Sequence, residues 1–229
     1  MRSLSNCIVA AILLAFTTRS LSQDTQTYGF LNLVNLVPSD KACKITLTGK
    51  DVVPGGLASA VATGWFIVPT GNIPLNLEIE GFDSGIGNIE VADAQSSIYV
   101  VFLEPNSRLD KDGKPLHPKI RIKRCEPLAT QSGFYLKVMS FCPDENRFLL
   151  GTKPINLKLY EAAEIPKWSG SPFKITHNQQ TAGETLPVTE KGSFYLFFGT
   201  DHSNNYCSVL VRAESQVLPP WMKQKKPTQ

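Results

Sequence analysis

The sequence predicts an all-β protein made of two tandem immunoglobulin-like antiparallel β-sandwiches. Two observations carry this prediction. Apolar and polar residues alternate in short runs, and Gly and Pro interrupt the chain between these runs, as is typical of short strands joined by turns. Three landmark stretches also recur in the same order in the two halves of the chain. No segment has sustained helical periodicity, so we expect packed sheets to bury the apolar faces.

The recurring landmarks begin with two related first strands. Residues 29–40 read GFLNLVNLVPSD and residues 133–145 read GFYLKVMSFCPDE, so both begin with Gly-Phe and end where Pro meets Asp. SIYVVF at 97–102 and SFYLFF at 193–198 share a Ser, a Tyr and a final Phe, and both are apolar on both faces, as central strands are. The alternating strands that follow them are PKIRIKRCE at 118–126 and YCSVLVRAE at 206–214.

The repeat predicts two homologous modules of immunoglobulin-like size. We assign β-sandwich module 1 to residues 27–127 and β-sandwich module 2 to residues 128–215. Within module 1 the alternation is clearest in PLNLEIEGF at 74–82, where Leu75 and Leu77 share one face and polar residues occupy the other. That pattern predicts a half-buried strand.

The first residues predict a secretory signal peptide over residues 1–22. Arg2 gives a positive start, and CIVAAILLAF at 7–16 is an apolar run. Ser20 and Ser22 are the small residues that a cut after Ser22 requires. An N-terminal membrane anchor is the alternative, but the run is shorter than the roughly 20 residues of a membrane span. We therefore expect an exported protein, located in the periplasm, on the cell surface or secreted.

The charge of the exported chain is nearly balanced. Loss of Arg2 and Arg19 with the leader leaves 21 basic and 20 acidic side chains. A nucleic-acid-binding protein usually carries a basic face or stripe, and the sequence predicts none. Residues 216–229, QVLPPWMKQKKPTQ, combine Pro with Lys and predict a flexible basic tail.

The cysteines predict two disulfides. Loss of Cys7 with the leader leaves Cys43, Cys125, Cys142 and Cys207, and an even number in an exported chain favours disulfide pairing. Four cysteines allow three pairings. Pairing within the modules, Cys43–Cys125 and Cys142–Cys207, keeps the symmetry of the repeat and is favoured. A zinc site is the alternative, but the sequence has no CxxC and no Cys/His cluster.

Several turn and strand residues mark the two modules: Asn35, Pro38, Asp40, Gly56, Trp65, Pro69 and Gly71 in module 1, and Pro143, Asp144 and Trp168 in module 2. With these residues the start of the mature chain resembles a bacterial family of secreted, often tandem, β-sandwich domains of unknown function. The resemblance rests on turn and strand residues over about 50 residues of module 1. It implies an envelope or extracellular structural or binding role and supplies no catalytic residues.

The histidines give no catalytic constellation. His117, His177 and His202 all lie in polar segments that predict loops. Asp201 and Ser203 flank His202, but neighbours on a loop seldom form a triad because their side chains diverge. The repeat matches this segment with LEPNS at 103–107 of module 1, which lacks His and Asp. We therefore expect GTDHS to be a solvated turn rather than a hydrolase site.

The stretch RLDKDGKPLHP at 108–118 resembles a calcium loop only in part. Asp110 and Asp112 have the spacing of the first two ligands, but Gly113 comes two places too early for an EF-hand loop. A DG turn between the last two strands of module 1 is favoured, and calcium is the alternative. We expect no metal and no cofactor.

These features predict a non-catalytic exported structural or binding protein of the cell envelope, with an envelope protein or a glycan as its partner. Carbohydrate binding is the alternative, because Trp168 lies in a turn-rich segment near Tyr160 and exposed aromatic rings bind sugars and partners. Trp168 and Tyr160 are thus the candidate ligand contacts. A hydrolase with an unrecognised site is the third hypothesis.

Overall fold

A computed structural model of the chain describes residues 27–104, 109–114, 116–128, 132–142, 146–165, 168–172, 174–177, 180–185 and 188–213. The predicted leader (1–22) and the predicted tail (216–229) lie outside these residues, so both stay predictions. The described residues form strands and turns without a helix, which confirms the prediction of an all-β protein. Accordingly, no helix in the described ranges has the length and apolarity needed to cross a bilayer.

The first half of the chain forms two sheets. One has the strand order β4-β1-β8-β9, with β5 also paired to β1, and the other has the order β3-β2-β6-β7. The strands are β1 (Tyr28–Asn35), β2 (Lys44–Leu47), β3 (Lys50–Asp51), β4 (Val61–Ala62), β5 (Phe66–Pro69), β6 (Gly71–Glu78), β7 (Gly85–Val91), β8 (Ser96–Leu103) and β9 (Ile120–Arg124).

The second half also forms two sheets, with the orders β13-β10-β16-β17 and β12-β11-β14-β15. The strands are β10 (Phe134–Ser140), β11 (Asn146–Leu150), β12 (Lys153–Leu157), β13 (Ala162–Ile165), β14 (Lys174–His177), β15 (Gln180–Glu184), β16 (Gly192–Thr200) and β17 (Tyr206–Arg212).

The two halves share one strand topology. β10, β16 and β17 occupy the places of β1, β8 and β9 in the first sheet of each half. The hairpins β11-β12 and β14-β15 occupy the places of β2-β3 and β6-β7 in the other sheet. Each half also encloses its own apolar core. The strands that carry the three sequence landmarks therefore have matching places in the two halves.

The first strand of each half pairs in parallel with the penultimate one. Leu33 lies opposite Tyr99 in the β1–β8 pair, and Val138 lies opposite Leu196 in the β10–β16 pair. The prediction of purely antiparallel sandwiches is wrong at these two pairs. A parallel pair needs a long connection, and here the whole second sheet of each half is contained in that connection.

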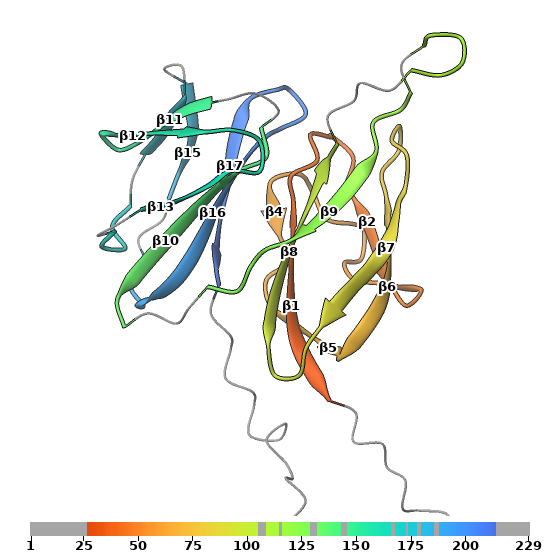
Figure 1. Cartoon of the computed structure of the whole chain (residues 1–229), viewed down its shortest axis with the longest axis horizontal. Coiled ribbons are helices and arrows are strands. Elements are labelled where there is room, and N and C mark those ends of the chain that lie inside the picture. The colour runs from red at the N-terminus through yellow and green to blue at the C-terminus, as the bar shows by residue number, and fades with distance from the viewer. Residues whose placement is uncertain are drawn as a thin grey trace, which may run out of the picture.

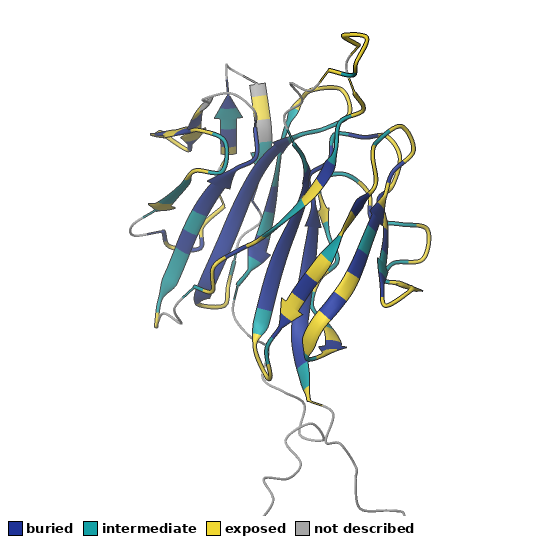
Figure 2. Cartoon of the chain, turned by 45° about the vertical axis from the view of Figure 1, so that its right-hand side comes forward, coloured by how far each residue is buried: buried dark blue, intermediate teal, exposed yellow. Residues whose placement is uncertain are grey.

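The two sheets that carry the parallel pairs pack face to face, so the chain forms four stacked layers (Figure 1). Apolar residues of both halves meet in a third core, which we call the central core. Figure 2 shows the strands in the middle of the molecule buried along most of their length. The buried members of the central core are Val34, Leu36, Ile98, Val100, Phe102, Cys125, Met139, Phe141, Tyr195, Phe197, Val209 and Val211.

Stacking of the two halves explains why SIYVVF and SFYLFF are apolar on both faces. Tyr99 and Val101 of β8 enter the core of the first half, whereas Val100 and Phe102 enter the central core. Successive residues of a strand point to opposite faces, so a sheet with a layer on each side needs apolar residues at every position. The burial of these strands was predicted correctly, but the second half was not foreseen as one of the covering layers.

Aromatic rings from both halves fill one part of the central core. Phe102 of β8 contacts Phe141, just after β10, with 5.2 Å between ring centroids. Tyr160 lies edge-on to both rings, at 5.1 Å from Phe102 and 5.8 Å from Phe141. Such geometries stabilise beyond the burial of apolar area alone. The two halves are therefore joined by specific ring packing.

The four described cysteines are free thiols, so neither predicted disulfide is formed. Cys43 lies in the core of the first half, whereas Cys125 lies in the central core. One sheet separates these two cores. The expected Cys43–Cys125 bond would have to pass through that sheet.

The expected Cys142–Cys207 bond is also excluded, because the two cysteines lie on opposite faces of one sheet. Cys142 lies in the core of the second half. Cys207 is the cross-strand partner of Gly199, and a Cβ on Gly199 would meet Leu36 of the first half at 3.3 Å. Directly opposed residues share a face of a sheet, so Cys207 lies on the face toward the first half and Cys142 on the other.

The cysteines of the two halves do not occupy equivalent positions, so the repeat does not predict how they pair. The Cys142 N–H donates to Ser140 Oγ at 3.2 Å, as the Val37 N–H donates to Asn35 Oδ1 at 3.0 Å. Cys142 is therefore the counterpart of Val37 and not of Cys43. In the same alignment Gly199 takes the place of Phe102, so Cys207, opposite Gly199, matches Arg121, opposite Phe102.

Candidate functional site

Among the hollows of the first half, one lies at each side of its two-sheet sandwich, and another, of about 440 Å³, lies over β6 and β7. Of the two at the sides, the larger has a volume of about 520 Å³ and lies between the β2-β3 hairpin and β5. We call it the β3/β5 hollow. Its volume falls within the range of small-molecule sites in proteins. The edge strands beside it are short, with two residues in β3 and four in β5.

The β3/β5 hollow has an apolar floor and a polar rim. Leu47, Val68 and Ile73 line it and belong to the core of the first half. Phe66 packs against the same core and is half-buried. The polar lining residues are Thr48, Lys50, Asp51, Thr70 and Asn72. An apolar floor with a few polar groups suits a ligand with an apolar body and a polar end.

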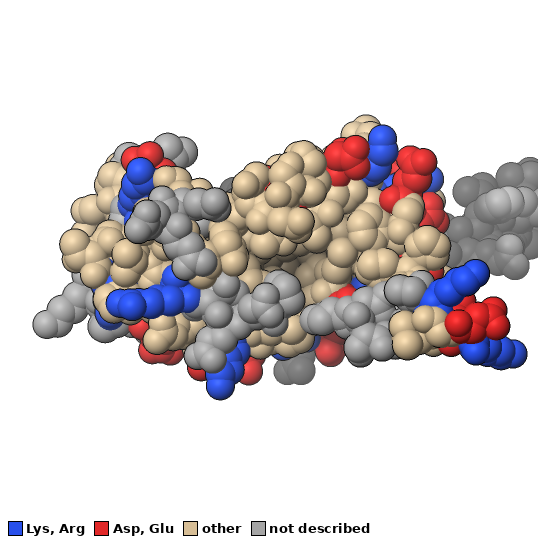
Figure 3. Space-filling view, turned by 90° about the horizontal axis from the view of Figure 1, so that it is seen from above, with Lys and Arg blue, Asp and Glu red and all other residues tan. Residues whose placement is uncertain are grey.

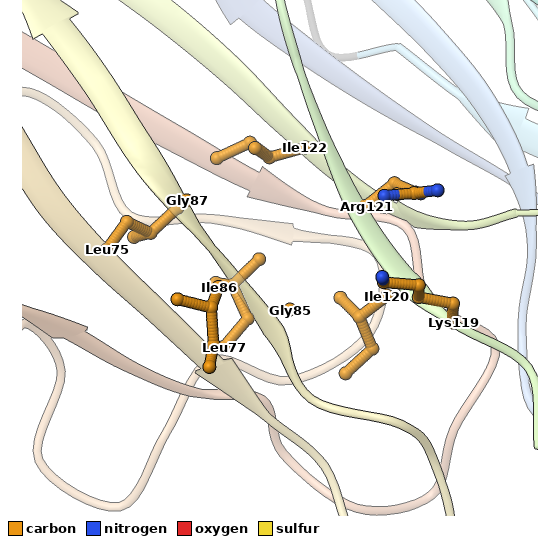
Figure 4. A pocket seen from close by; sticks show the side chains of 9 residues that line it. All are labelled: Leu75, Leu77, Gly85, Ile86, Gly87, Lys119, Ile120, Arg121 and Ile122. Carbon is orange, nitrogen blue, oxygen red and sulfur yellow. The ribbon is translucent and has the colours of Figure 1, made fainter.

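The smaller hollow, of about 130 Å³, lies between the edge strands β7 and β9. Figure 4 shows Leu77 and Ile86 on one side of this opening and Ile120 on the other. A Cβ on Gly85 would lie 3.0 Å from the Ile120 carbonyl oxygen, so the absence of a side chain lets β9 approach β7 there. The hollow is too small for most ligands, since typical sites exceed about 300 Å³.

Two contacts bound this smaller hollow. At one end the Ile120 N–H donates to the Asp83 carbonyl at 3.3 Å. At the other end Arg124 of β9 forms a 3.3 Å ion pair with Glu90 of β7. The Tyr99 hydroxyl also accepts from the Glu90 N–H and donates to the Glu90 carbonyl, both at 2.9 Å. These contacts hold both ends of β7 in place, whereas the edge of β7 between them has no strand partner among the described residues on this side.

The predicted ligand contacts Trp168 and Tyr160 do not form one site. Trp168 is 9% exposed and lies in the core of the second half, with its ring 5.3 Å from that of Phe194. Its indole N–H donates to the Ser171 carbonyl at 3.2 Å. Tyr160 packs on the central core instead. Trp168 is therefore buried at the edge of the sandwich and does not offer its ring to a ligand as an exposed tryptophan would.

His177 also departs from its prediction. It ends β14, is 5% exposed, and its Nδ1 lies 2.7 Å from the Arg147 carbonyl oxygen. Its ring packs 4.0 Å from that of Tyr206 and 5.1 Å from that of Phe148. Ile175 and His177 are buried, whereas Lys174 is exposed. The short alternation of KITH at 174–177 was the sequence signal for this strand.

The other predicted loops behave as turns. Asp201 Oδ1 accepts from the Ser203 and Asn205 N–H groups at 2.8 and 2.9 Å. Burial acts to raise the pKa of Asp201, but the hydrogen bonds from Asn205 and Ser203 and the nearby His202 outweigh burial and lower it. The carboxylate is therefore engaged in shaping its own turn.

The DG segment of the first half is a turn of the same kind. Asp110 Oδ1 accepts from the Asp112 and Lys114 N–H groups at 2.9 and 2.8 Å. The carboxylate that would head a calcium loop is thus occupied by the backbone. Within the described ranges, no cluster of three or more His, Cys, Asp or Glu side chains could hold a metal ion.

Three of the thiols, two buried and one half-buried, are poor nucleophiles at neutral pH. Burial raises the pKa of Cys43, Cys125 and Cys207 to about 12 in each case. For Cys207 the neighbouring Asp201 and Cys142 raise the pKa further. The thiolate is the reactive form of cysteine, so these side chains act as packing residues.

The surface shows charges of both signs side by side. On the face in Figure 3, Lys and Arg side chains lie next to Asp and Glu side chains at several places. Among the basic residues of β9, Arg121 pairs with Glu104 at 2.9 Å and Arg124 with Glu90 at 3.3 Å. Such interspersion does not resemble the single-sign stripe of a nucleic-acid-binding protein.

Comparisons with known proteins leave the chain without an assigned family. No protein-family model matches the sequence. No curated protein matches it either. Functional inference therefore rests on the geometry described above.

Proposed function

We propose that the chain is a non-catalytic, exported binding protein of the cell envelope, built from two tandem immunoglobulin-like sandwiches. Its ligand is a small amphipathic molecule that occupies the β3/β5 hollow. The observation that carries this proposal is the combination of an apolar floor, a polar rim and a volume of about 520 Å³ in one place.

The short edges beside the hollow favour a small molecule over a peptide. A peptide that adds to a sheet needs a run of free backbone groups, and β3 has only two residues while β5 has four. The apolar floor provides the affinity for an apolar body. Lys50 and Asp51 on the rim can bind a polar or charged end.

Several observations support a non-catalytic role. The pKa values of three thiols, two buried and one half-buried, are raised to about 12. His177 is enclosed by aromatic rings and the Arg147 carbonyl. Asp110 and Asp201 are occupied by their own turns. These groups are thereby used in packing and turn formation.

The test is a titration with the fluorescent amphiphile 1-anilinonaphthalene-8-sulfonate, which has an apolar body and one anionic end. We compare the wild-type chain with Phe66→Ala and with the matched control Trp65→Ala. Phe66 packs on the core of the first half beside the hollow, whereas its neighbour Trp65 packs on the central core. Phe66→Ala should weaken binding at least fivefold and Trp65→Ala should leave it unchanged.

Equal effects of the two substitutions, or the absence of saturable binding to the wild type, would refute the proposed site. Near-ultraviolet circular dichroism of each variant checks that the fluorescence does not come from a loosened core.

A further inference from the structure

We infer that the open edge of β7 pairs with the same edge of a second copy of this chain. β7 is the last strand of its sheet, and the only described strand it pairs with there is β6. An exposed strand edge offers unpaired N–H and C=O groups to another strand. The inference is independent of the β3/β5 hollow, because it concerns the opposite side of the first half.

The register identifies which backbone groups of β7 are free. Asn88 lies opposite Pro74, whose carbonyl accepts from the Thr48 N–H on the other side of β6. Neighbouring residues of an antiparallel ladder alternate in direction, so the N–H and C=O of Asn88 point away from β6. The same holds for Ile86, two residues earlier.

Glu90 is the next residue whose backbone groups point away from β6, and these groups already have a hydrogen-bond partner. Its N–H and C=O both bind the Tyr99 hydroxyl at 2.9 Å. The other end is closed where the Ile120 N–H bonds the Asp83 carbonyl. The edge is therefore open at Ile86 and Asn88. Within the described residues, no hydrogen bond reaches the outward N–H and C=O groups of these two residues.

This open stretch lacks the features that protect edge strands. Lys, Pro and inward-pointing charges usually keep an edge strand from pairing with another chain. Residues 85–89 read GIGNI and contain none of these residues. Ile86 is 85% exposed, the highest value among the large apolar side chains described. A Cβ on Gly87 would meet nothing within 4 Å, and glycine in a strand often marks a place where another backbone approaches.

The second half closes the equivalent side. There a Cβ on Gly183 of β15 would lie 2.2 Å from Ser208 Oγ of β17. β15 thus packs directly on β17 at the place where β7 separates from β9. The opening is a particular property of the first half and is not dictated by the shared topology.

A two-fold axis at Gly87 gives a register in which the outward backbone groups of Ile86 and Asn88 all find partners. Ile86 of one copy then lies opposite Asn88 of the other, and both residues have their free groups on the shared edge, so two such pairs form. Gly87 faces Gly87 at the axis, where opposed Cα atoms come closest. The interface is self-complementary, as a two-fold dimer requires.

Charge favours a second copy over an unrelated strand. The paired segment contains no charged residue, and Glu90 of each copy lies opposite Ser84 of the other in this register. The arginines of β9 beneath the edge are already paired, Arg121 with Glu104 and Arg124 with Glu90. The approach of two copies therefore brings no unpaired arginines together.

Sedimentation velocity of the full mature chain over a range of concentrations tests the inference. Because the edge is short, we expect a weak dimer, with Kd between about 1 µM and 1 mM. Ile86→Lys should raise Kd at least tenfold. Asn88→Pro should do the same, because its N–H points outward and the β6–β7 ladder stays intact.

Ile67→Lys is the matched control, since Ile67 is a 37% exposed apolar residue on β5, and it should leave Kd unchanged. Because Asn88→Pro can fail to fold, amide exchange of the wild type gives a second readout. The Ile86 and Asn88 amides should exchange more slowly at high concentration, while the Glu90 amide should not change.

A monomer at about 1 mM overturns the inference. So does a dimer that Ile86→Lys and Asn88→Pro leave intact, or a concentration-independent exchange of the Ile86 and Asn88 amides. Dimer formation through any other surface would protect different amides and would count against this edge.

Discussion

Asp110 and Asp201 perform the same structural task at matching places in the two halves. Each Oδ1 accepts hydrogen bonds from the N–H groups two and four residues further on. Each also donates its own N–H to the carbonyl four residues ahead, at 2.8 Å. Both turns connect the last two strands of their half. The counterpart of the His202 turn is therefore the DG segment.

Asp201→Ala should lower the free energy of unfolding by about 1 kcal/mol, because two backbone N–H groups lose their acceptor. Asp201→Asn is the control and should lose less, since its Oδ1 still accepts. Urea denaturation measures both. Equal losses in the two variants would contradict the turn role. The lowered pKa of Asp201 means that its ionised form stabilises the fold above the ordinary value of 3.8, and this contribution disappears as pH falls through the lowered pKa.

The comparison of these turns shows why the sequence alignment of the halves was only partly right. Ser97 lies opposite Leu31, whereas Leu136, the counterpart of Leu31, lies opposite Phe194, so SIYVVF and SFYLFF are offset by one residue in the two sheets. The loop after 103 is also longer in the first half than its counterpart. LEPNS was therefore matched with GTDHS when the true counterpart lay several residues further on. The conclusion that His202 lies in a turn agrees with the structure, although its supporting comparison was misaligned.

Phe141→Ala should destabilise the protein by about 3 to 5 kcal/mol, the usual range for a buried Phe. Phe141 is 8% exposed and contacts Phe102 from the other half. Because the halves share the central core, we expect the wild type to unfold in one cooperative calorimetric transition. The variant should show a broadened or split transition. A wild type with two separate transitions would contradict this coupling.

Phe134→Ala supplies the control for that experiment. Phe134 packs on the core of the second half, so its loss should destabilise that half without separating the two. The two variants thus distinguish a loss of inter-half packing from a general loss of apolar contacts.

Alternation and turns could be predicted from the sequence because they depend on neighbouring residues. The burial of Trp168 and His177 could not, because it depends on long-range contacts with Phe194 and Tyr206. The same limit applies to the β3/β5 hollow, whose lining comes from β2, β3, β5 and β6 and the residues between them. A polar local sequence predicts a loop, but it does not show what that loop covers.

Tyr99→Phe should destabilise the first half by about 1 to 3 kcal/mol, because the Glu90 N–H and C=O both lose their partner. The variant should also free the outward N–H and C=O of Glu90, which extends the open edge of β7 to that residue. If β7 pairs with a second copy, this variant should dimerise more tightly than the wild type. Sedimentation velocity measures the change, and a Kd equal to that of Ile86→Lys would contradict it.

Expression with residues 1–22 in a host that exports secreted proteins should yield a chain that begins at Gln23. The expected cut follows Ser22, which has Ser20 two residues before it. N-terminal sequencing of the purified protein measures the cut. Replacing Ser22 with Arg, which signal peptidase does not accept at that position, should block it. Retention of Met1 in the wild type would favour the membrane-anchor alternative.

Stability should fall with rising alkaline pH because of the buried thiols. The folded protein holds the pKa of Cys125 at about 12, mainly through burial, whereas the unfolded chain releases this proton near the ordinary value of 9.0. Below that value the thiol is neutral in both states and its contribution is fully present. Between about pH 9 and 12 the unfolded chain binds fewer protons, so the free energy of unfolding declines by about 1.4 kcal/mol per pH unit for each such thiol.

Cys125→Ala tests this contribution, since the two proteins otherwise carry the same side chains. The variant should lose stability less steeply with pH than the wild type in urea denaturations between pH 8 and 11, a range of about three units around the thiol pKa. A reducing agent should leave the melting temperature of the wild type unchanged, because the thiols are free. A large drop on reduction, or parallel pH slopes for the two proteins, would show that Cys125 is not a buried free thiol in solution.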